Sequence, residues 1–492
     1  MLESARILLP ILASGLAPPA IYLARRNINH REAASFVCSA LTCLSVLWLL
    51  PDVLRGEIPT LTVFTLYPGI HVKFAADGLS ILFAFVSSFL WIFATSYNIG
   101  YMRSLNEHAQ NRYYFCFAVA IFGAQGVSFA GNVFTLYLFY EIITIFTYPL
   151  VAHHQDEEGY EGGRKYLVYL MGTSKLFLLP AMVLTYVLCG TLDFHVGDVL
   201  KGMFPADANP TLVTVTYVLF IAGLAKAAIM PLHNWLPSAM VAPTPVSALL
   251  HAVAVVKAGV FCICRVILSG FGLDLMGKLG LGLPTAYVAA FTIVAASLIA
   301  LTKDDLKARL AYSTVSQLSY VVIGVALLTP SAVEGGMAHI VHHAFSKITL
   351  FFAAGAIYVA SHTKKISLMS GLGRRMPWTF GAFAVASLSM IGVPPVCGFV
   401  SKWYLVNGTL QADQMVLLCA LLASTILNAA YFTPIVYKAF FEAPLPEVEH
   451  HVHGEAPLTM VVPLCLTAVI SVAIGIYTKP VFTVIEAFVR GF

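Results

Sequence analysis

Five lysines stand inside apolar stretches of this sequence, away from the loops that hold most of its basic residues. They are Lys175, Lys226, Lys257, Lys347 and Lys402. A charged side chain near the centre of a bilayer costs at least about 2.5–3.5 kcal/mol, so such residues usually mark an ion pathway. A buried lysine can release its proton near neutral pH, whereas an arginine stays protonated. All five basic residues predicted inside the spans are lysines and none is an arginine, and this predicts proton transfer.

A proline-rich break within residues 221–259 separates two apolar helices. The first helix is predicted over about 211–230 and ends at Pro231. The second is predicted to begin at Pro243 or Pro245, because proline fits the first turn of a helix and breaks its interior. An interrupted helix inside a membrane is typical of an ion or substrate site.

Lys257 stands deep in the second of these helices. It lies twelve residues past Pro245, or ~18 Å along a helix at ~1.5 Å per residue. That depth is near the middle of a hydrocarbon core ~30 Å thick, too far for its ammonium group to reach the interface. Lys226, nearer the break, could reach the interface by snorkelling. We interpret both lysines, with His251, as parts of an ion path.

Glu141 is the only acidic residue predicted deep inside a span, and Asp77 stands at the mouth of another. Glu141 follows Asn132 by nine residues, ~13 Å into its helix. A carboxylate at that depth is costly unless it is protonated or paired. We predict Lys226 as its partner. The pair either switches, because each charge affects the protonation of the other, or is a static ion pair.

His339, His343 and Lys347 follow one another at intervals of four residues. Successive members step about 40° around a helix, so they form one stripe, with the hydroxyls of Ser346 and Thr349 nearby. Because histidine titrates near pH ~6.5, the stripe predicts a proton relay. The alternative is a packed polar helix interface. A metal at the two histidines is disfavoured because no third ligand is evident.

Lys402 follows a second break, at Pro394 and Pro395, in the stretch GVPPVCGFVSKWYLVNG. Its place after a break predicts a counterpart of Lys226. Lys175, in MGTSKLFLLP, is expected only to tune its neighbours.

Other polar clusters are interpreted as solvated loops rather than sites. One comprises His450, His451 and His453 with Glu447, Glu449 and Glu455; the other comprises Asp156, Glu157, Glu158 and Glu161. The nine cysteines fall in apolar segments and predict neither disulfides nor an iron–sulfur site. The sequence shows no Rossmann glycine pattern, P-loop or hydrolytic triad, so we expect no catalytic residue, cofactor or metal.

Composition places the chain in a membrane. Its 492 residues are 59% hydrophobic and only 11% charged, against ~25% charged in soluble domains. We predict an all-α polytopic protein that binds no nucleic acid. Its fourteen predicted spans are about 5–24, 34–54, 77–98, 113–130, 132–152, 166–190, 211–230, 243–269, 284–302, 305–328, 333–360, 377–410, 414–441 and 457–478.

The span pattern predicts both orientation and repeats. Most loop lysines and arginines follow odd-numbered spans, which puts those loops in the cytoplasm and both termini outside. The twelfth span is too long for one helix and reads as broken, like the seventh, so two structural repeats are expected. The predicted divisions are 1–112 (helices 1–3), 113–270 (helices 4–8), 284–441 (helices 9–13) and 457–492 (the last helix and tail).

Several stretches resemble one family of membrane subunits. They are AKAAIMPLHNWLPSAMVAPTPVSALLHAVAVVKAGV, AADGLS at 75–80, DDLKARLAYSTVSQLSY at 304–320 and HHAFSKITLFFAAGAIY at 342–358. These resemble the proton-conducting, antiporter-like subunits of respiratory complex I, membrane-bound hydrogenases and Mrp-type sodium/proton antiporters. The resemblance implies fourteen spans in which two inverted five-helix repeats contain broken helices seven and twelve.

The resemblance also implies roles for individual residues. It matches positions of a hydrated proton axis to Glu141, Lys226, Lys257, His251, His339, His343, Lys347 and Lys402. Proton uptake and release in the family are thought to follow changes in a pair like Glu141–Lys226. One complex I subunit carries glutamate where Lys402 stands, and the largest has a long C-terminal lateral helix that is not seen here. The chain looks most like the D subunit of the Mrp-type antiporters.

Three functions stay open on sequence grounds. The first is a proton-translocating subunit of a multisubunit Na⁺/proton antiporter in the inner (plasma) membrane, with other membrane subunits as partners. The second is a proton-pumping subunit of a redox-driven complex, in which partner subunits supply the electrons. The third is a non-conducting membrane scaffold whose polar axis is structural.

Overall fold

The computed structural model describes residues 5–445 and 454–490 of the chain. Helices make up most of it. The main ones are α2 (Leu8–Leu23), α3 (Ile28–Leu54), α4 (Gly78–Ser104), α5 (Gln110–Ser128), α6 (Val133–Val151), α7 (Glu157–Thr173), α8 (Leu179–Cys189), α9 (Pro210–Gly223), α12 (Val255–Arg265), α14 (Gly282–Leu301), α15 (Leu306–Ala326), α16 (Pro330–Ser361), α17 (Pro377–Ile391), α18 (Cys397–Gln411), α19 (Met415–Phe441), α21 (Leu458–Ile476) and α22 (Lys479–Phe488).

These helices confirm the predicted all-α membrane architecture. Within the described residues, nine helical segments are long and apolar enough to cross a membrane, and α2, α9 and α17 are shorter apolar helices. Each of the fourteen predicted spans overlaps at least one of the observed helices. α15 is less apolar along its length, and its polar side chains such as Ser313 and Gln317 are buried against other helices.

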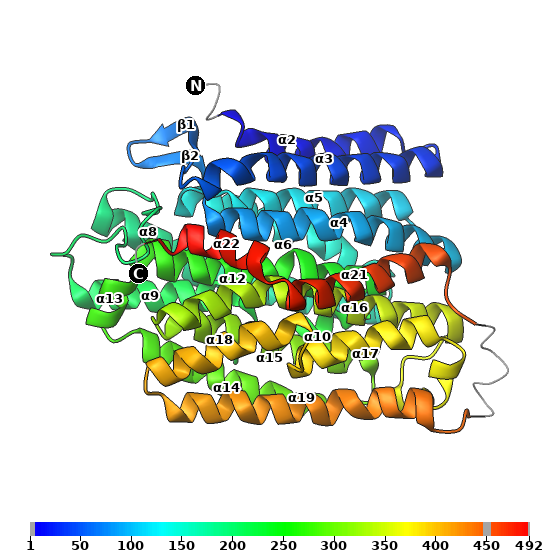
Figure 1. The fold of residues 1–492 in the computed structure, drawn as a ribbon. Coiled ribbons are helices and arrows are strands. Elements are labelled where there is room, and N and C mark those ends of the chain that lie inside the picture. The colour runs from blue at the N-terminus through cyan, green and yellow to red at the C-terminus, as the bar shows by residue number, and fades with distance from the viewer. Residues whose placement is uncertain (1–4, 446–453, 491–492) are drawn as a thin grey trace.

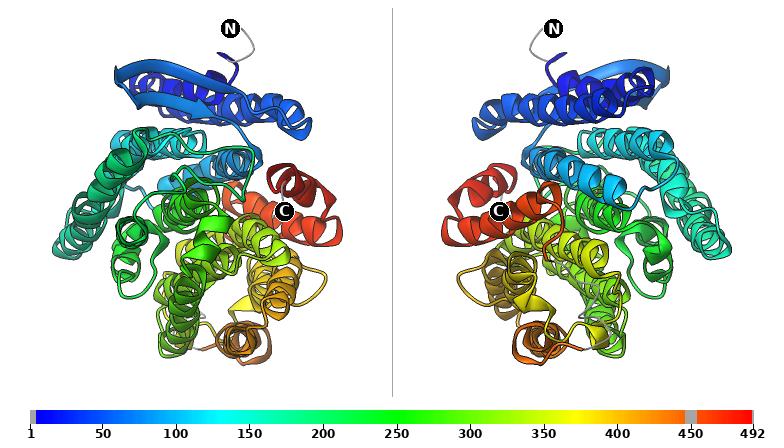
Figure 2. Two further views of the ribbon diagram at one scale, coloured as in Figure 1. Left: turned by 90° about the vertical axis from the view of Figure 1, so that its left-hand side faces the viewer. Right: turned by 90° about the vertical axis from the view of Figure 1, so that its right-hand side faces the viewer.

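The helices run side by side as a layered bundle (Figure 1). α2 and α3 form one edge and pack on α5 and α4, whereas α14 and α19 lie at the opposite edge. The end-on views show α21 and α22, in red, on the flank of the bundle (Figure 2), where they pack against α4 and α16. The interior helix α16 and the segment Thr244–Phe271 are the most deeply covered.

The seventh span is broken earlier than the sequence predicts. α9 ends at Gly223, and Lys226 lies in a short 3₁₀ turn, η2 (Ala225–Ala227), not in the helix itself. The chain then passes through α10 (Trp235–Ser238) and η3 (Ala239–Val241) before α11 (Thr244–Ala248) begins, as predicted, between the two prolines. Lys226 is therefore part of the break.

The second predicted break is confirmed between α17 and α18. Gly392 ends α17 with a φ of +93°, a conformation that glycine adopts without steric cost. Gly398 lies so close to α17 that a Cβ there would stand 1.9 Å from the Ser389 carbonyl oxygen. Gly259 on α12 permits an equally close approach to the first break, because a Cβ there would stand 2.3 Å from the Ala227 nitrogen.

π-helical turns interrupt two spans at candidate site residues, and the sequence analysis did not predict them. Lys175 lies in η1 (Ser174–Leu178) and His251 in η4 (Leu249–Val253); a further π-helical turn, η5 (Val266–Phe271), follows α12. Such turns leave backbone groups out of the regular ladder and occur often at functional sites. An antiparallel hairpin, β1 (Thr60–Tyr67) and β2 (Ile70–Ala75), also forms where no element was predicted.

Arg265 is buried inside the eighth predicted span, contrary to the prediction that only lysines lie inside the spans. Arg265, in the last turn of α12, is 1% exposed and forms a two-pronged ion pair with Asp77. Asp77 also caps α4 by accepting a hydrogen bond from the Ser80 backbone. A charge-assisted bidentate pair offsets the desolvation of both groups, so this arginine ties α12 to α4.

Candidate functional site

Glu141 pairs with Lys175 and not with Lys226, so that predicted partner was wrong. The Lys175 ammonium lies 2.9 Å from the Glu141 carboxylate and donates a 2.6 Å hydrogen bond to the Tyr137 hydroxyl. Tyr137 and Glu141 are one turn apart on α6, and the π-helical turn η1 presents Lys175 to both. The Lys175 side chain is 45% exposed, so this charge pair is accessible from outside the bundle.

Lys226 is completely buried against the same helix, α6. Its ammonium donates to the Tyr140 carbonyl oxygen at 2.6 Å and to the Thr144 hydroxyl at 2.7 Å. It also lies over the Tyr140 ring, a cation–π contact. Lys226 thus touches α6 one residue away from Glu141, and the carboxylate acts on it through its electric field. Sequence reasoning missed Tyr140 and Thr144, which show no distinctive spacing.

Lys257 forms the central contact of the path. Its nitrogen lies 2.8 Å from His343 Nδ1, and both residues are buried. A protonated lysine would donate to a neutral imidazole, and a neutral lysine could accept from Nδ1–H. One short hydrogen bond can therefore hold the proton on either partner. This contact joins α12 to α16, and hence the two predicted halves of the chain.

The histidine–lysine stripe on α16 separates into two environments. Lys347 turns to α15, where it donates to the Leu310 carbonyl oxygen at 3.1 Å and the Ser313 hydroxyl at 2.9 Å. His339 and His343 remain neighbours, with ring centroids 5.9 Å apart. The whole stripe is buried, and its polar contacts are with three other helices rather than with one packed interface.

His339 connects the stripe to the second break. Its Nε2 lies 3.0 Å from Gln317 Oε1 and its Nδ1 2.9 Å from the Ser401 hydroxyl. The next residue, Lys402, donates to the carbonyl oxygens of Met390 and Ile391 at 2.7 and 3.1 Å. These are the last carbonyls of α17, which the break leaves without helical partners.

Along the path, two buried histidines lack hydrogen-bond partners among the described residues. His251 has both ring nitrogens unpaired and packs on Phe351 at 4.5 Å between ring centroids. His342 is likewise buried and unpaired. Buried polar groups normally have a partner or an ordered water. Sequence reasoning missed His342, although it stands in the quoted stretch HHAFSKITLFFAAGAIY beside His343.

Negative charge is scarce along this path. Among described residues 284–441 no acidic side chain is buried, and Glu141 alone lies among the lysines. Charges in a low-dielectric interior interact strongly, so a proton on one lysine disfavours a proton on its neighbours.

A cavity of about 580 Å³ opens at one end of the bundle, beside the first break. Thr244 and Lys307 line it, and the half-buried Lys307 donates to the Ala242 carbonyl oxygen at 2.6 Å. Glu158 and Glu161 also line it, so part of the acidic cluster interpreted as a solvated turn forms a cavity wall. Asp156 instead caps α7 through the Gly159 backbone.

The second loop cluster falls largely outside the described residues: His450, His451, His453, Glu447 and Glu449 lie there. Glu455 is described, and its carboxylate accepts hydrogen bonds from the backbone nitrogens of Trp378 and Thr379 at 2.7 and 3.2 Å. It caps the start of α17, so this residue is structural.

Known proteins share both the sequence and the fold. The transmembrane family of NADH:quinone oxidoreductase and Mrp antiporter subunits matches residues 130–428, which include every lysine of the path. The chain belongs to this family, as the resemblance predicted. It is therefore an antiporter-like polytopic membrane subunit of the kind found in Mrp and complex I-like complexes.

Individual relatives come from both branches of the family. The chain is 32% identical over 427 residues to NADH-quinone oxidoreductase subunit N of Desulforudis audaxviator, covering 83% of this chain and 82% of that protein. It is 30% identical over 426 residues to a probable K⁺/H⁺ antiporter A/B subunit of Rhizobium meliloti, covering 83% of this chain and 40% of that protein. A chain of the Mrp complex from Dietzia sp. has the same fold, with a TM-score of 0.86 and 22% identity. The match covers 100% of this chain and 97% of the Dietzia chain.

Proposed function

We propose that this chain is the proton-translocating subunit of a multisubunit monovalent cation (Na⁺)/proton antiporter. The observation that carries the proposal is the buried 2.8 Å contact between Lys257 and His343. It joins two titratable groups from α12 and α16 at the centre of a membrane-embedded bundle. A purely structural axis does not need ionisable partners at that cost.

The route has three groups of residues. The first holds Glu141, Lys175 and Lys226; the second holds Lys257, His343, Lys347 and His251; the third holds His339 and Lys402. The unpaired nitrogens of His251, His342 and His343 favour ordered water between the groups, because buried polar atoms of this kind usually bind it. Protons would then pass by short hops between lysine, histidine and water.

The charge pair in the first group supplies a switch. While Lys175 is paired with Glu141, the negative charge of Glu141 stabilises the protonated form of Lys226 less. If Lys175 swings away, which its partial exposure permits, Glu141 favours a proton on Lys226. Loading and release of Lys226 would therefore follow the Glu141–Lys175 pair, and this gives Lys175 a larger role than tuning.

The broader assignment has several parts. We propose that residues 113–270 and 284–441 are the two inverted repeats, and that both termini face outward from the inner membrane. The partners are other membrane subunits of the parent complex. The stretch GVPPVCGFVSKWYLVNG supports the D subunit of an Mrp-type antiporter, and the relative named as a K⁺/H⁺ antiporter component supports an antiporter in general.

A redox-driven complex is the second candidate for the parent assembly. The observation that favours it is the 32% identity to NADH-quinone oxidoreductase subunit N, which extends over 82% of that subunit. The same path would then pump protons, with the electrons handled by partner subunits. Neighbouring genes separate the candidates: antiporter subunits support the first, and hydrogenase-like or quinone-reducing subunits the second.

The deciding experiment is sodium-driven proton flux in vesicles that hold the whole complex. Wild type is compared with Lys226→Ala and Glu141→Gln, and a pull-down verifies assembly of each variant. Lost flux in an assembled complex supports the path. Normal flux in both variants would leave the scaffold hypothesis standing. A wild type without sodium-linked flux would favour the redox-driven complex.

A further inference from the structure

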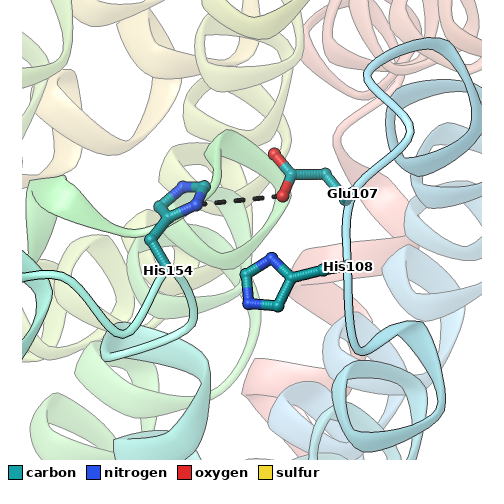
Figure 3. Close-up of side chains that lie close together, drawn as sticks. All are labelled: Glu107, His108 and His154. Atoms are coloured by element: carbon teal, nitrogen blue, oxygen red, sulfur yellow. Dashed lines mark ion pairs between the residues drawn. The ribbon is translucent and has the colours of Figure 1, made fainter.

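Side chains that can bind a metal converge outside the membrane-spanning path, where the loop between α4 and α5 meets the turn after α6. Glu107, His108 and His154 face one another there (Figure 3), and one ligand atom of each lies within 4.8 Å of the others. The His154 Nδ1 atom is 3.8 Å from the Glu107 carboxylate. His154 stands more than forty positions after the adjacent Glu107 and His108, so only the fold brings it to them.

A fourth side chain points independently to a ligand at this place. His153 is completely buried, and both its ring nitrogens lack a hydrogen-bond partner among the described residues. Its Nε2 is 3.7 Å from the Glu107 carboxylate, and its ring centroid is 4.7 Å from that of His108. A buried imidazole without partners is costly, and a metal ion would satisfy it.

The donor set selects a class of metal. Imidazole nitrogens with one carboxylate suit Zn²⁺ and similar transition ions, whereas Mg²⁺ and Ca²⁺ prefer oxygen ligands. Ligand atoms around tetrahedral Zn²⁺ lie about 3.4 Å apart, given bonds of about 2.0–2.1 Å. His108 and His154 are exposed and can make the small rotations that this geometry needs.

We propose that Glu107, His108 and His154, with His153 as the fourth ligand, form a binding site for a Zn²⁺-class divalent cation. A bound ion would fasten the α4–α5 loop to the turn between α6 and α7. Glu107 and His154 also line the cavity beside the first break, so the ion would occupy the wall of that cavity. The site does not depend on the function proposed above.

The test measures metal binding by the purified full-length chain in detergent. Isothermal titration with Zn²⁺ gives the affinity, and the visible spectrum of added Co²⁺ reports a tetrahedral nitrogen–oxygen site. The variants are His108→Asn and His154→Asn. The matched controls are His195→Asn, an exposed histidine in the loop between α8 and α9, and a triple replacement of His450, His451 and His453 by Asn.

We expect saturable Zn²⁺ binding that each site variant weakens by at least about tenfold and neither control changes. The tetrahedral Co²⁺ spectrum should disappear with His108 or His154. Binding that is lost only in the triple control would assign the metal to that loop and overturn the proposal. An absence of saturable binding would also overturn it. Thermal unfolding without metal shows whether each variant is folded.

Discussion

The two broken helices hold their lysines in different ways. In the first break, Lys226 reaches out to a neighbouring helix, bonding to Tyr140 and Thr144 of α6. In the second break, Lys402 of α18 donates to the carbonyl oxygens of Met390 and Ile391. These lie at the end of α17, the other half of the same broken helix. A movement of α6 relative to the first break would change the contact of Lys226, whereas the contact of Lys402 lies within one broken helix.

The surroundings of the two lysines differ in charge as well. α6 also carries Glu141, which is paired with the half-exposed Lys175. No described acidic side chain is buried in residues 284–441, so Lys402 has only neutral partners. On the proposed path, the first half would therefore hold an adjustable charge pair, and the second half a lysine held by neutral groups of its own broken helix.

The largest effect is expected at the contact between the halves. Lys257→Met preserves the shape of the side chain but removes the partner of His343. Proton flux should fall by at least about tenfold, the effect of ~1.4 kcal/mol on a barrier. Flux in vesicles measures it, with Lys278→Met, an exposed lysine at the end of α13 (Leu273–Lys278), as the control. Unchanged flux in an assembled Lys257→Met complex would break the proposed route.

The next effect concerns the close approaches at the two breaks. Gly259→Ala would place a methyl group 2.3 Å from the Ala227 nitrogen, and Gly398→Ala would place one 1.9 Å from the Ser389 oxygen. Each should cost ~1–3 kcal/mol of stability through overpacking. Thermal unfolding in detergent measures the loss. Gly172→Ala in α7 is the control, because a Cβ there meets nothing within 4 Å; a similar loss in all three would contradict the argument.

A double-mutant cycle tests whether the charge switch is confined to the first half. Glu141→Gln and Lys175→Met should be non-additive in flux, with a coupling energy of ~0.5–3 kcal/mol, because the two groups are in contact. Glu141→Gln and Lys402→Met should be nearly additive. Equal coupling energies in both cycles would contradict the idea that the charge switch is confined to the first half.

The smallest effect is expected at one hydroxyl. Thr144→Val removes a single hydrogen bond from Lys226, worth ~0.5–1.5 kcal/mol, and should slow flux by a few fold. Thr409→Val, at a buried threonine on α18 whose hydroxyl donates to the Val406 carbonyl oxygen of the same helix, should leave flux unchanged. If Thr144→Val has no effect on flux while Lys226→Ala abolishes it, the Tyr140 carbonyl alone holds Lys226.

Sequence reasoning could pick out the candidate residues of the path because their signals are local. Lysines in apolar segments, prolines at helix breaks and regular spacing on one helix can each be detected within about thirty residues. The spans, the second break, the start of the eighth helix and the family were predicted and are confirmed. The roles of the site residues stay predictions that the flux measurements test.

Tertiary structure decided which groups meet. Glu141 forms its ion pair with Lys175 rather than with Lys226, because the π-helical turn η1 holds Lys175 beside α6. The tertiary structure buried Arg265 by pairing it with Asp77 nearly two hundred residues away. It also gathered Glu107, His108, His153 and His154 from two loops. Hydropathy and helical period fix where a residue stands along its helix, but which residue faces it depends on packing between helices, and no single segment encodes that packing.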